Sequence, residues 1–207
     1  MLNALSVDVE DWFQVGAFET VIDRQSWDSR ECRVERNTDN VLALFEEADV
    51  KATFFTLGWV AQRHPALMRR ISDAGHELAS HGWHHERVFR LDRVSFAKDL
   101  EMSRKAIEDA AGVRVTGYRA PSFSIDYRTP WAYMVLAEQG FAYSSSVAAV
   151  AHDHYGWAEA PRFAFGNQLE AGDPTLALES RFGESVIDGL RALGHRIEAI
   201  DPWGAVA

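Results

Sequence analysis

Two histidines, His81 and His85, stand four residues apart directly after a short apolar segment. At this spacing both imidazoles can face one divalent cation, and a carboxylate from another strand would complete a site with three protein ligands. An acidic group earlier in the chain supplies the candidate carboxylates Asp8, Glu10 and Asp11. An open coordination position can hold water and later a substrate oxygen, so the pattern indicates metal-dependent hydrolysis.

The segments that must position these residues alternate between strand-like and helix-like patterns. Repeated βα units predict a parallel sheet with helices outside it, and such sheets gather their chemistry at the carboxyl ends of the strands. The acidic group, the histidine pair and the segment 119–121 each follow a predicted strand. Strands are predicted at 2–9, 51–57, 76–80, 114–119 and 141–145, and helices at 39–48, 65–74, 95–111 and 129–139.

The composition is that of one soluble domain. The 207 residues are 47% hydrophobic and 25% charged, which is enough to bury a core. The formal net charge of -10, without any basic run, disfavours a nucleic-acid partner. No segment approaches the ~18 apolar residues of a membrane span, and charges occur too early for a signal peptide. With a single cysteine, Cys32, these features predict a cytoplasmic protein.

Three motifs, in order, resemble those of the NodB-type polysaccharide deacetylases, carbohydrate esterase family four. The acidic segment 6–11 resembles the first family motif, the segment 81–85 the second, and Arg119-Ala120-Pro121 the third. The sequences in and around these motifs are most similar to those of the subgroup encoded in exopolysaccharide and exosortase loci. The resemblance covers residues 1–165 and implies an α/β fold with a distorted, incomplete (β/α) barrel.

The resemblance implies a hydrolase that removes N-acetyl groups from the sugars of an exopolysaccharide or its precursor. His81 and His85 would hold the metal, with zinc favoured by imidazole ligands and cobalt or nickel as alternatives. Asp8 would be the general base, and Arg119 would hold and orient its carboxylate. The residues expected to contact the N-acetylated carbohydrate are Trp83, Pro121, Ser122 and Phe123.

The third protein ligand of the metal has two candidates. Side chains at positions 8 and 10 share one face of a strand, which favours Glu10. A strand that ends at Glu10 would instead let Asp11 turn inward. We prefer Asp11, because its reach is shorter and it matches the second aspartate of the family motif. Taken singly, Asp8 and Asp11 would each also suit a cap on the segment after the strand.

Residues 166–207 depart from the family pattern. The segment 174–207 is typical of a helix ended by Gly194 and then a short strand, and it weakly resembles the tail of gamma-glutamyltransferases. The late histidine with which the family protonates the leaving amine has no recognisable counterpart, and His195 is a weak candidate. We therefore separate a deacetylase-like domain at 1–165 from an atypical segment at 166–207. We expect impaired activity and self-association through open sheet edges.

Two other functions fit the same residues. One is a NodB-fold amidohydrolase acting on a small C–N substrate, similar to allantoinase-like relatives. The other is a catalytically inactive carbohydrate-binding module, which the missing late histidine would allow. Zinc content together with acetate release separates an active deacetylase from a binding module, and a comparison of ureides with N-acetylglucosamine oligomers separates the two enzymes.

Overall fold

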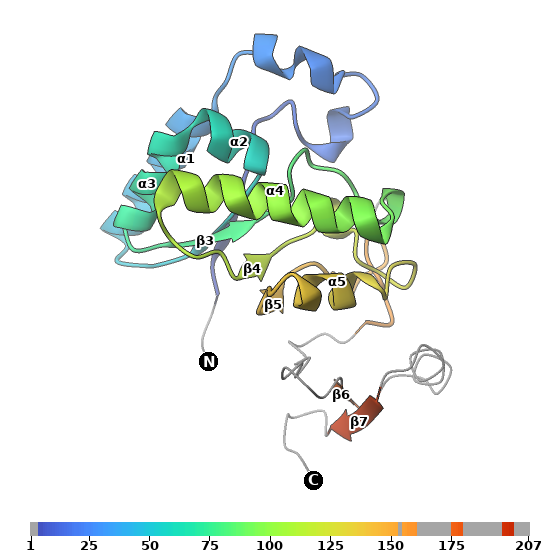
Figure 1. Cartoon of the computed structure of the whole chain (residues 1–207). Coiled ribbons are helices and arrows are strands. Elements are labelled where there is room, and N and C mark those ends of the chain that lie inside the picture. The colour runs from blue at the N-terminus through green and yellow to red at the C-terminus, as the bar shows by residue number, and fades with distance from the viewer. Residues whose placement is uncertain (1–3, 153–154, 161–174, 180–195, 201–207) are drawn as a thin grey trace. The chain divides into compact units, whose positions relative to one another are not determined.

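The computed structural model describes residues 4–152, 155–160, 175–179 and 196–200 (Figure 1). The chain divides into two compact units, Met1–Ser146 and Val147–Ala207. The first unit contains the acidic group, the histidine pair and Arg119, so it is the unit that positions the candidate site. Its end lies earlier in the chain than residue 165, where the resemblance placed the domain boundary.

A parallel sheet forms the centre of the first unit. Its five strands lie in the order β1-β2-β3-β4-β5, and each neighbouring pair is parallel. Within the described residues β1 and β5 are open edges, which confirms the prediction of an α/β fold with an incomplete barrel. The strands are Ser6–Val9 (β1), Thr53–Thr56 (β2), Glu77–Ser80 (β3), Gly117–Tyr118 (β4) and Tyr143–Ser144 (β5).

Helices connect the strands and cover the sheet. Figure 1 shows α4 lying across β3 and β4, with α3 on one side and α5 on the other. None of the helices described in this structure combines the length and apolarity that a membrane-spanning helix needs. The helices are Val34–Glu47 (α1), Gly58–Arg63 (α2), Pro65–Asp73 (α3), Arg93–Ala111 (α4) and Ala132–Glu138 (α5), with 3-10 turns at Gly16–Phe18 (η1), Arg24–Ser29 (η2), Val88–Arg90 (η3) and Pro121–Phe123 (η4).

Helix α4 has a clear signal in the sequence at each end. The Asp92 carboxylate accepts a hydrogen bond of 2.7 Å from the Ser95 amide, as an N-cap does. Gly112 ends the helix with a φ of 72°, a left-handed conformation that glycine adopts at little cost. Between these ends the buried face carries residues at three- and four-residue spacing, Phe96, Leu100, Ser103 and Ile107.

Helix α1 begins earlier than the sequence predicts, at Val34 instead of residue 39. The reason is a contact from a distant part of the chain. The Asp11 carboxylate accepts hydrogen bonds from the amides of Arg33 and Val34, at 2.7 and 3.0 Å. A carboxylate at this end satisfies amides that lack partners within the helix and interacts favourably with the helix dipole.

Helix α2 is absent from the sequence prediction, because Gly58–Arg63 is too short to display a helical period. Its start is held by backbone contacts. The amides of Gly58 and Trp59 donate hydrogen bonds to the carbonyls of Gly82 and Trp83, at 2.9 and 3.2 Å. These bonds join α2 to the loop that carries both candidate histidine ligands.

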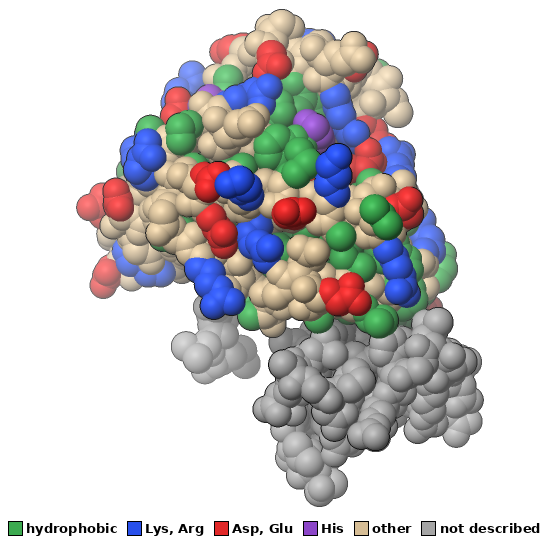
Figure 2. Space-filling view, in the orientation of Figure 1, with side chains coloured by type: hydrophobic (Ala, Val, Ile, Leu, Met, Phe, Trp, Pro, Cys, Tyr) green, Lys and Arg blue, Asp and Glu red, His purple; other side chains and the backbone are tan. Residues whose placement is uncertain are grey.

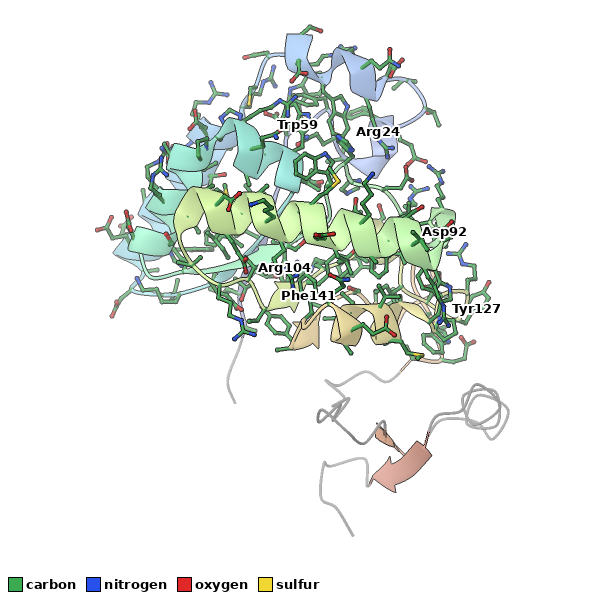
Figure 3. The ribbon with its side chains drawn as sticks, viewed as in Figure 1. Arg24, Trp59, Asp92, Arg104, Tyr127 and Phe141 are labelled. Atoms are coloured by element: carbon green, nitrogen blue, oxygen red, sulfur yellow. The ribbon has the colours of Figure 1, made fainter. Side chains whose placement is uncertain are left out.

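The segment between β1 and α1 is anchored by an aromatic cluster. The buried rings of Phe13, Trp27 and Trp59 meet with centroids 5.6 to 6.0 Å apart. Edge-to-face and tilted pairs of this kind add about 0.5–1.5 kcal/mol each beyond the area that they bury. Figure 3 shows Trp59 and Arg24 at the same end of the unit. The cluster therefore fixes a segment that would otherwise be a long loop.

The face that α4 presents carries charges of both signs. Figure 2 shows Lys and Arg side chains interspersed with Asp and Glu side chains over this face. One exposed pair on α4 joins Lys105 to Asp109 at 2.8 Å, one helical turn apart. On this face the basic side chains do not gather into the kind of patch that nucleic-acid-binding proteins present.

The second unit contains two described strands, Thr175–Glu179 (β6) and Arg196–Ile200 (β7), which pair in parallel. Strand β7 agrees with the strand predicted after Gly194. Strand β6 was not predicted. The helix predicted before Gly194 lies outside the described residues.

Replacing Gly58 by alanine should lower the free energy of unfolding by about 1–3 kcal/mol, because overpacking forces neighbouring groups to move. A β-carbon at this position would lie 2.4 Å from Trp83 Cε3 and 2.8 Å from Ser103 Cα of α4. Denaturant unfolding of the whole chain measures the loss. Gln62→Ala, at an exposed position of α2, is the control and should change stability by less than about 0.5 kcal/mol. Equal stability of Gly58→Ala and the unaltered protein would contradict this close packing.

Candidate metal centre

The candidate site lies where three strands end. Glu10 follows β1, His81 follows β3 and Arg119 follows β4. Because the strands are parallel, their carboxyl ends share one edge of the sheet, where α/β proteins place their chemistry. Residues far apart in the sequence are therefore brought together by the pairing of the strands.

Glu10, His81 and His85 form a cluster that can hold a metal ion. One ligand atom from each residue lies within 4.8 Å of the other two. His85 Nε2 and Glu10 Oε2 are 3.1 Å apart, yet Oε2 is buried and accepts no hydrogen bond from the described residues. Two imidazoles facing an unpartnered carboxylate oxygen are the donor set of zinc and similar cations, so these residues fit a divalent metal.

Both histidines are held in place by the protein. His81 Nδ1 lies 2.8 Å from the carbonyl oxygen of Arg119. Because a carbonyl can only accept, Nδ1 carries the proton and Nε2 remains available as a ligand. His85 has a left-handed backbone with a φ of 55°, a conformation that is costly for a residue other than glycine and is concentrated at functional sites.

The structure brings Glu10, not Asp11, to the two histidines, and the preference for Asp11 as the third ligand is corrected accordingly. The Asp11 side chain faces backbone amides instead: Oδ2 accepts from Arg33 and Val34, and Oδ1 accepts from Trp12 at 2.9 Å. Asp11 is therefore the cap of α1. The alternation of side chains along β1 already favoured Glu10. The start of α1, which is distant in sequence, engages Asp11 through its amides and leaves Glu10 to face the histidines.

Burial shifts the protonation of all three cluster residues. Burial, and then the negative charge of Asp8, raises the pKa of Glu10 to about 8. Burial, and then the neighbouring His81, lowers the pKa of His85 to about 3, and burial also lowers the pKa of His81. At neutral pH both imidazoles are thus neutral, as ligands must be, while Glu10 holds a proton that a bound cation would displace.

Asp8 and Arg119 form the ion pair that the sequence predicts. Arg119 Nη1 lies 2.7 Å from Asp8 Oδ1. The guanidinium is held by further bonds from Nη2 to the hydroxyls of Ser6 and Ser145, both at 2.9 Å, and it stacks 4.1 Å from the ring centroid of Phe55. Asp8 Oδ2 is left free of this pair and lies 4.0 Å from His81 Nε2. The oxygen that faces the cluster is thus the one that Arg119 leaves open.

The four predicted substrate contacts have different positions. Phe123 lies beside Arg119, with 5.6 Å from its ring centroid to the guanidinium carbon, and Ser122 borders the space beside Gly16. Pro121 is buried. The ring of Trp83 covers Gly58 at the start of α2, so its observed contact is the packing of the histidine loop against α2.

Asp99 on α4 supports the histidine loop and was not among the residues predicted from the sequence. Its carboxylate oxygens lie 3.1 and 3.2 Å from the Trp83 amide, from which they accept hydrogen bonds. Burial raises the pKa of Asp99 to about 6. The signal was present in the sequence, because Asp99 stands beside Leu100 within the apolar stripe of a predicted helix.

Zinc affinity should rise about tenfold per pH unit below the Glu10 pKa of about 8 and then level off, because zinc must displace the Glu10 proton while both imidazoles stay neutral. Competition with a chromophoric chelator at a series of pH values measures this slope. Glu10→Gln should bind more weakly and lose the slope, whereas His81→Ala with His85→Ala should abolish binding. An identical slope in Glu10→Gln would exclude Glu10 as the titrating ligand.

Several known proteins are similar in sequence to this chain. A family model described as polysaccharide deacetylase matches residues 25–141, which include both histidines and Arg119 but not the acidic group. The chain is 32% identical over 107 residues to the peptidoglycan deacetylase of Helicobacter pylori, covering 52% of this chain and 36% of that protein. It is also 32% identical over 84 residues to a peptidoglycan-N-acetylglucosamine deacetylase of Listeria monocytogenes, covering 41% and 18%.

A solved structure from Mycobacterium smegmatis, described as a polysaccharide deacetylase, is also similar to this chain. Its TM-score is 0.59 at 25% identity, and the match covers 96% of this chain and 76% of that one. This chain spans between 15% and 38% of the length of the curated relatives that it matches. The family match extends over more than half of the chain and includes the histidine pair of the cluster. The chain therefore belongs to the polysaccharide deacetylase family.

Proposed function

We propose that this chain carries the active site of a metal-dependent deacetylase that hydrolyses the N-acetyl groups of polysaccharide sugars. One observation carries the proposal. The cluster of Glu10, His81 and His85 lies at the same sheet edge as the paired Asp8 and Arg119. This arrangement combines a set of metal ligands with a carboxylate that can accept a proton, as hydrolysis of an amide requires.

Zinc is the metal that we propose, with cobalt or nickel as alternatives, since two imidazoles and one carboxylate suit all three. A bound divalent cation would polarise the amide carbonyl and lower the pKa of water at the site. The protein contributes Nε2 of His81, fixed by its bond from Nδ1 to the Arg119 carbonyl, and the buried Glu10 carboxylate. The bond from His81 Nδ1 fixes the orientation of the ring, which limits reorganisation during the reaction.

Asp8 is the residue that we propose as general base. Its Oδ1 is engaged by Arg119 Nη1 at 2.7 Å, so Oδ2 is the atom available to take a proton from the attacking water. Arg119 keeps the carboxylate in one orientation, because four hydrogen bonds and the Phe55 ring hold its guanidinium. A general base that is fixed in this way needs little rearrangement to reach the transition state.

The sugar is a finer part of the proposal. The relatives from Helicobacter pylori and Listeria monocytogenes are named for action on peptidoglycan. The sequences of the motifs, in contrast, resemble those of the exopolysaccharide subgroup. An N-acetylated amino sugar is common to both classes of polymer. We propose such a sugar, within an exopolysaccharide or its precursor, as the substrate. His195, the candidate for protonating the leaving amine, lies outside the described residues.

Asp8→Asn should lower turnover by roughly 10²-fold or more while zinc remains bound, because the base is lost and the ligands are kept. Acetate release and zinc stoichiometry measured on the same samples test this. Asp11→Asn is the matched control: it keeps an acceptor oxygen for the α1 amides but loses the charge, so it should lower stability by about 0.3–1 kcal/mol and leave turnover within a few-fold. Retained turnover in zinc-loaded Asp8→Asn would exclude Asp8 as the base.

Acetate release from a panel of glycans should be abolished by a chelator and restored by zinc, because the ligands alone supply no Lewis acid. The panel contains peptidoglycan fragments, N-acetylglucosamine oligomers and an N-acetylated exopolysaccharide, with a ureide as the test of small-substrate amidohydrolase activity. We expect activity on the exopolysaccharide to exceed that on the peptidoglycan fragments. Zinc binding without acetate release from any glycan would contradict the proposed activity.

A further inference from the structure

Arg87, two residues after His85, has an edge of its guanidinium without a partner. Its Nη1 donates to Glu19 Oε1 at 3.0 Å. Its Nε is buried and makes no hydrogen bond to the described residues, and Nη2 likewise makes none among them. The Nε and Nη2 groups form the side of a guanidinium that binds a carboxylate through two parallel hydrogen bonds. The part of Arg87 best suited to an anion is thus unused within the described protein.

This edge borders the narrow space beside Gly16, which has no side chain to occupy it. A β-carbon added to Gly16 would lie 3.1 Å from Arg87 Nη2, 3.0 Å from Ser122 Oγ and 3.9 Å from His85 Cε1. The missing side chain leaves a cradle where a guanidinium, a hydroxyl and the ring of a candidate metal ligand converge. Two donors next to a metal ligand are suited to an oxygen atom that carries negative charge.

The backbone around the cradle is strained. His85 and Ser122 have φ values of 55° and 53°, and Phe123, the residue after Ser122, has a φ of 49°. Left-handed backbone at residues other than glycine costs free energy and is concentrated at ligand-binding sites. The Ser122 hydroxyl reaches the cradle from this strained segment.

The charges around Arg87 also favour an anion. Glu19 is shared, since it pairs with Arg87 and also with Arg90 at 2.9 Å. Glu86 pairs with Arg24 at 2.6 Å and lies 3.7 Å from Arg90. Within this network three guanidinium groups face two carboxylates, which leaves one positive charge in excess.

We propose that Arg87 and Ser122 form a carboxylate-binding subsite beside His85. The proposal rests on the proposed function, and it specifies what the site binds in addition to the metal. The carboxylate has two possible sources with the same chemistry: the acetate that deacetylation produces, or the acid group of a uronate sugar in the substrate. In either case Arg87 would bind it side-on through Nε and Nη2, with Ser122 donating the third hydrogen bond.

Sodium acetate is the probe for the subsite, titrated into the zinc-loaded and the metal-free full chain and followed by calorimetry. Arg87→Met should weaken acetate binding by about tenfold or more, and Arg87→Lys, which keeps the charge without the fork, should fall between Met and Arg. The matched control is Arg90→Met. It removes one positive charge of the network and a partner of Glu19, but no donor of the cradle, so it should lower acetate affinity by no more than about threefold.

Two substrates distinguish the two possible sources of the bound carboxylate. Acetate release is measured on a neutral N-acetylglucosamine oligomer and on an oligomer of the same length that contains uronate. A higher KM of Arg87→Met for the uronate oligomer alone would identify the sugar acid, whereas weaker product inhibition by acetate with both oligomers would identify the product.

Unchanged acetate affinity in Arg87→Met, or an equal loss in Arg90→Met, would overturn the subsite. Zinc stoichiometry and the thermal midpoint establish that each variant is folded, and Arg87→Lys decides the outcome if Arg87→Met does not fold. Acetate binding that depends on Arg87, in a protein that releases no acetate from any glycan, would refute the proposed function and leave the subsite standing.

Discussion

The parallel pairing of β1, β2, β3 and β4 assembles the candidate site. It places the carboxyl ends of β1, β3 and β4 at one edge, so that Glu10, His81 and Arg119 meet although the chain separates them widely. A parallel sheet needs crossover helices, and these cover the faces of the sheet. At the strand ends, burial is the main cause of the shifted pKa values of Glu10 and His85.

Three neighbouring carboxylates at the end of β1 have different partners, and each partner suits the carboxylate to a different role. Asp8 pairs with Arg119, Glu10 faces the histidines without a hydrogen bond to its buried oxygen, and Asp11 caps α1. Each environment suits one task. A cation-paired carboxylate can serve as a base, an unpartnered buried one as a metal ligand, and one that accepts backbone amides as a structural cap. The residue type is the same or similar throughout, and the partner determines the role.

The segment between β1 and α1 contributes a second layer of the site. Its aromatic rings pack against Trp59 of α2, and its charged residues pair with the segment 86–90 after the histidine loop. Apolar packing supplies the stability of this arrangement, since exposed ion pairs contribute little by themselves. The charges instead set the direction of Arg87, whose remaining edge points to the space beside Gly16.

The alternation of strands and helices and the histidine pair at i and i+4 could be predicted from the sequence, because they depend on local periodicity and short motifs. The partnership of Asp8 with Arg119 was implied by the resemblance to the polysaccharide deacetylases. The choice of Glu10 over Asp11 required the tertiary structure, since Asp11 is engaged by amides of a helix that starts more than twenty residues later. The cradle of Gly16, Arg87 and Ser122 required it too. Three segments that are remote in sequence converge there, and no local pattern records a contact between side chains that only packing brings together.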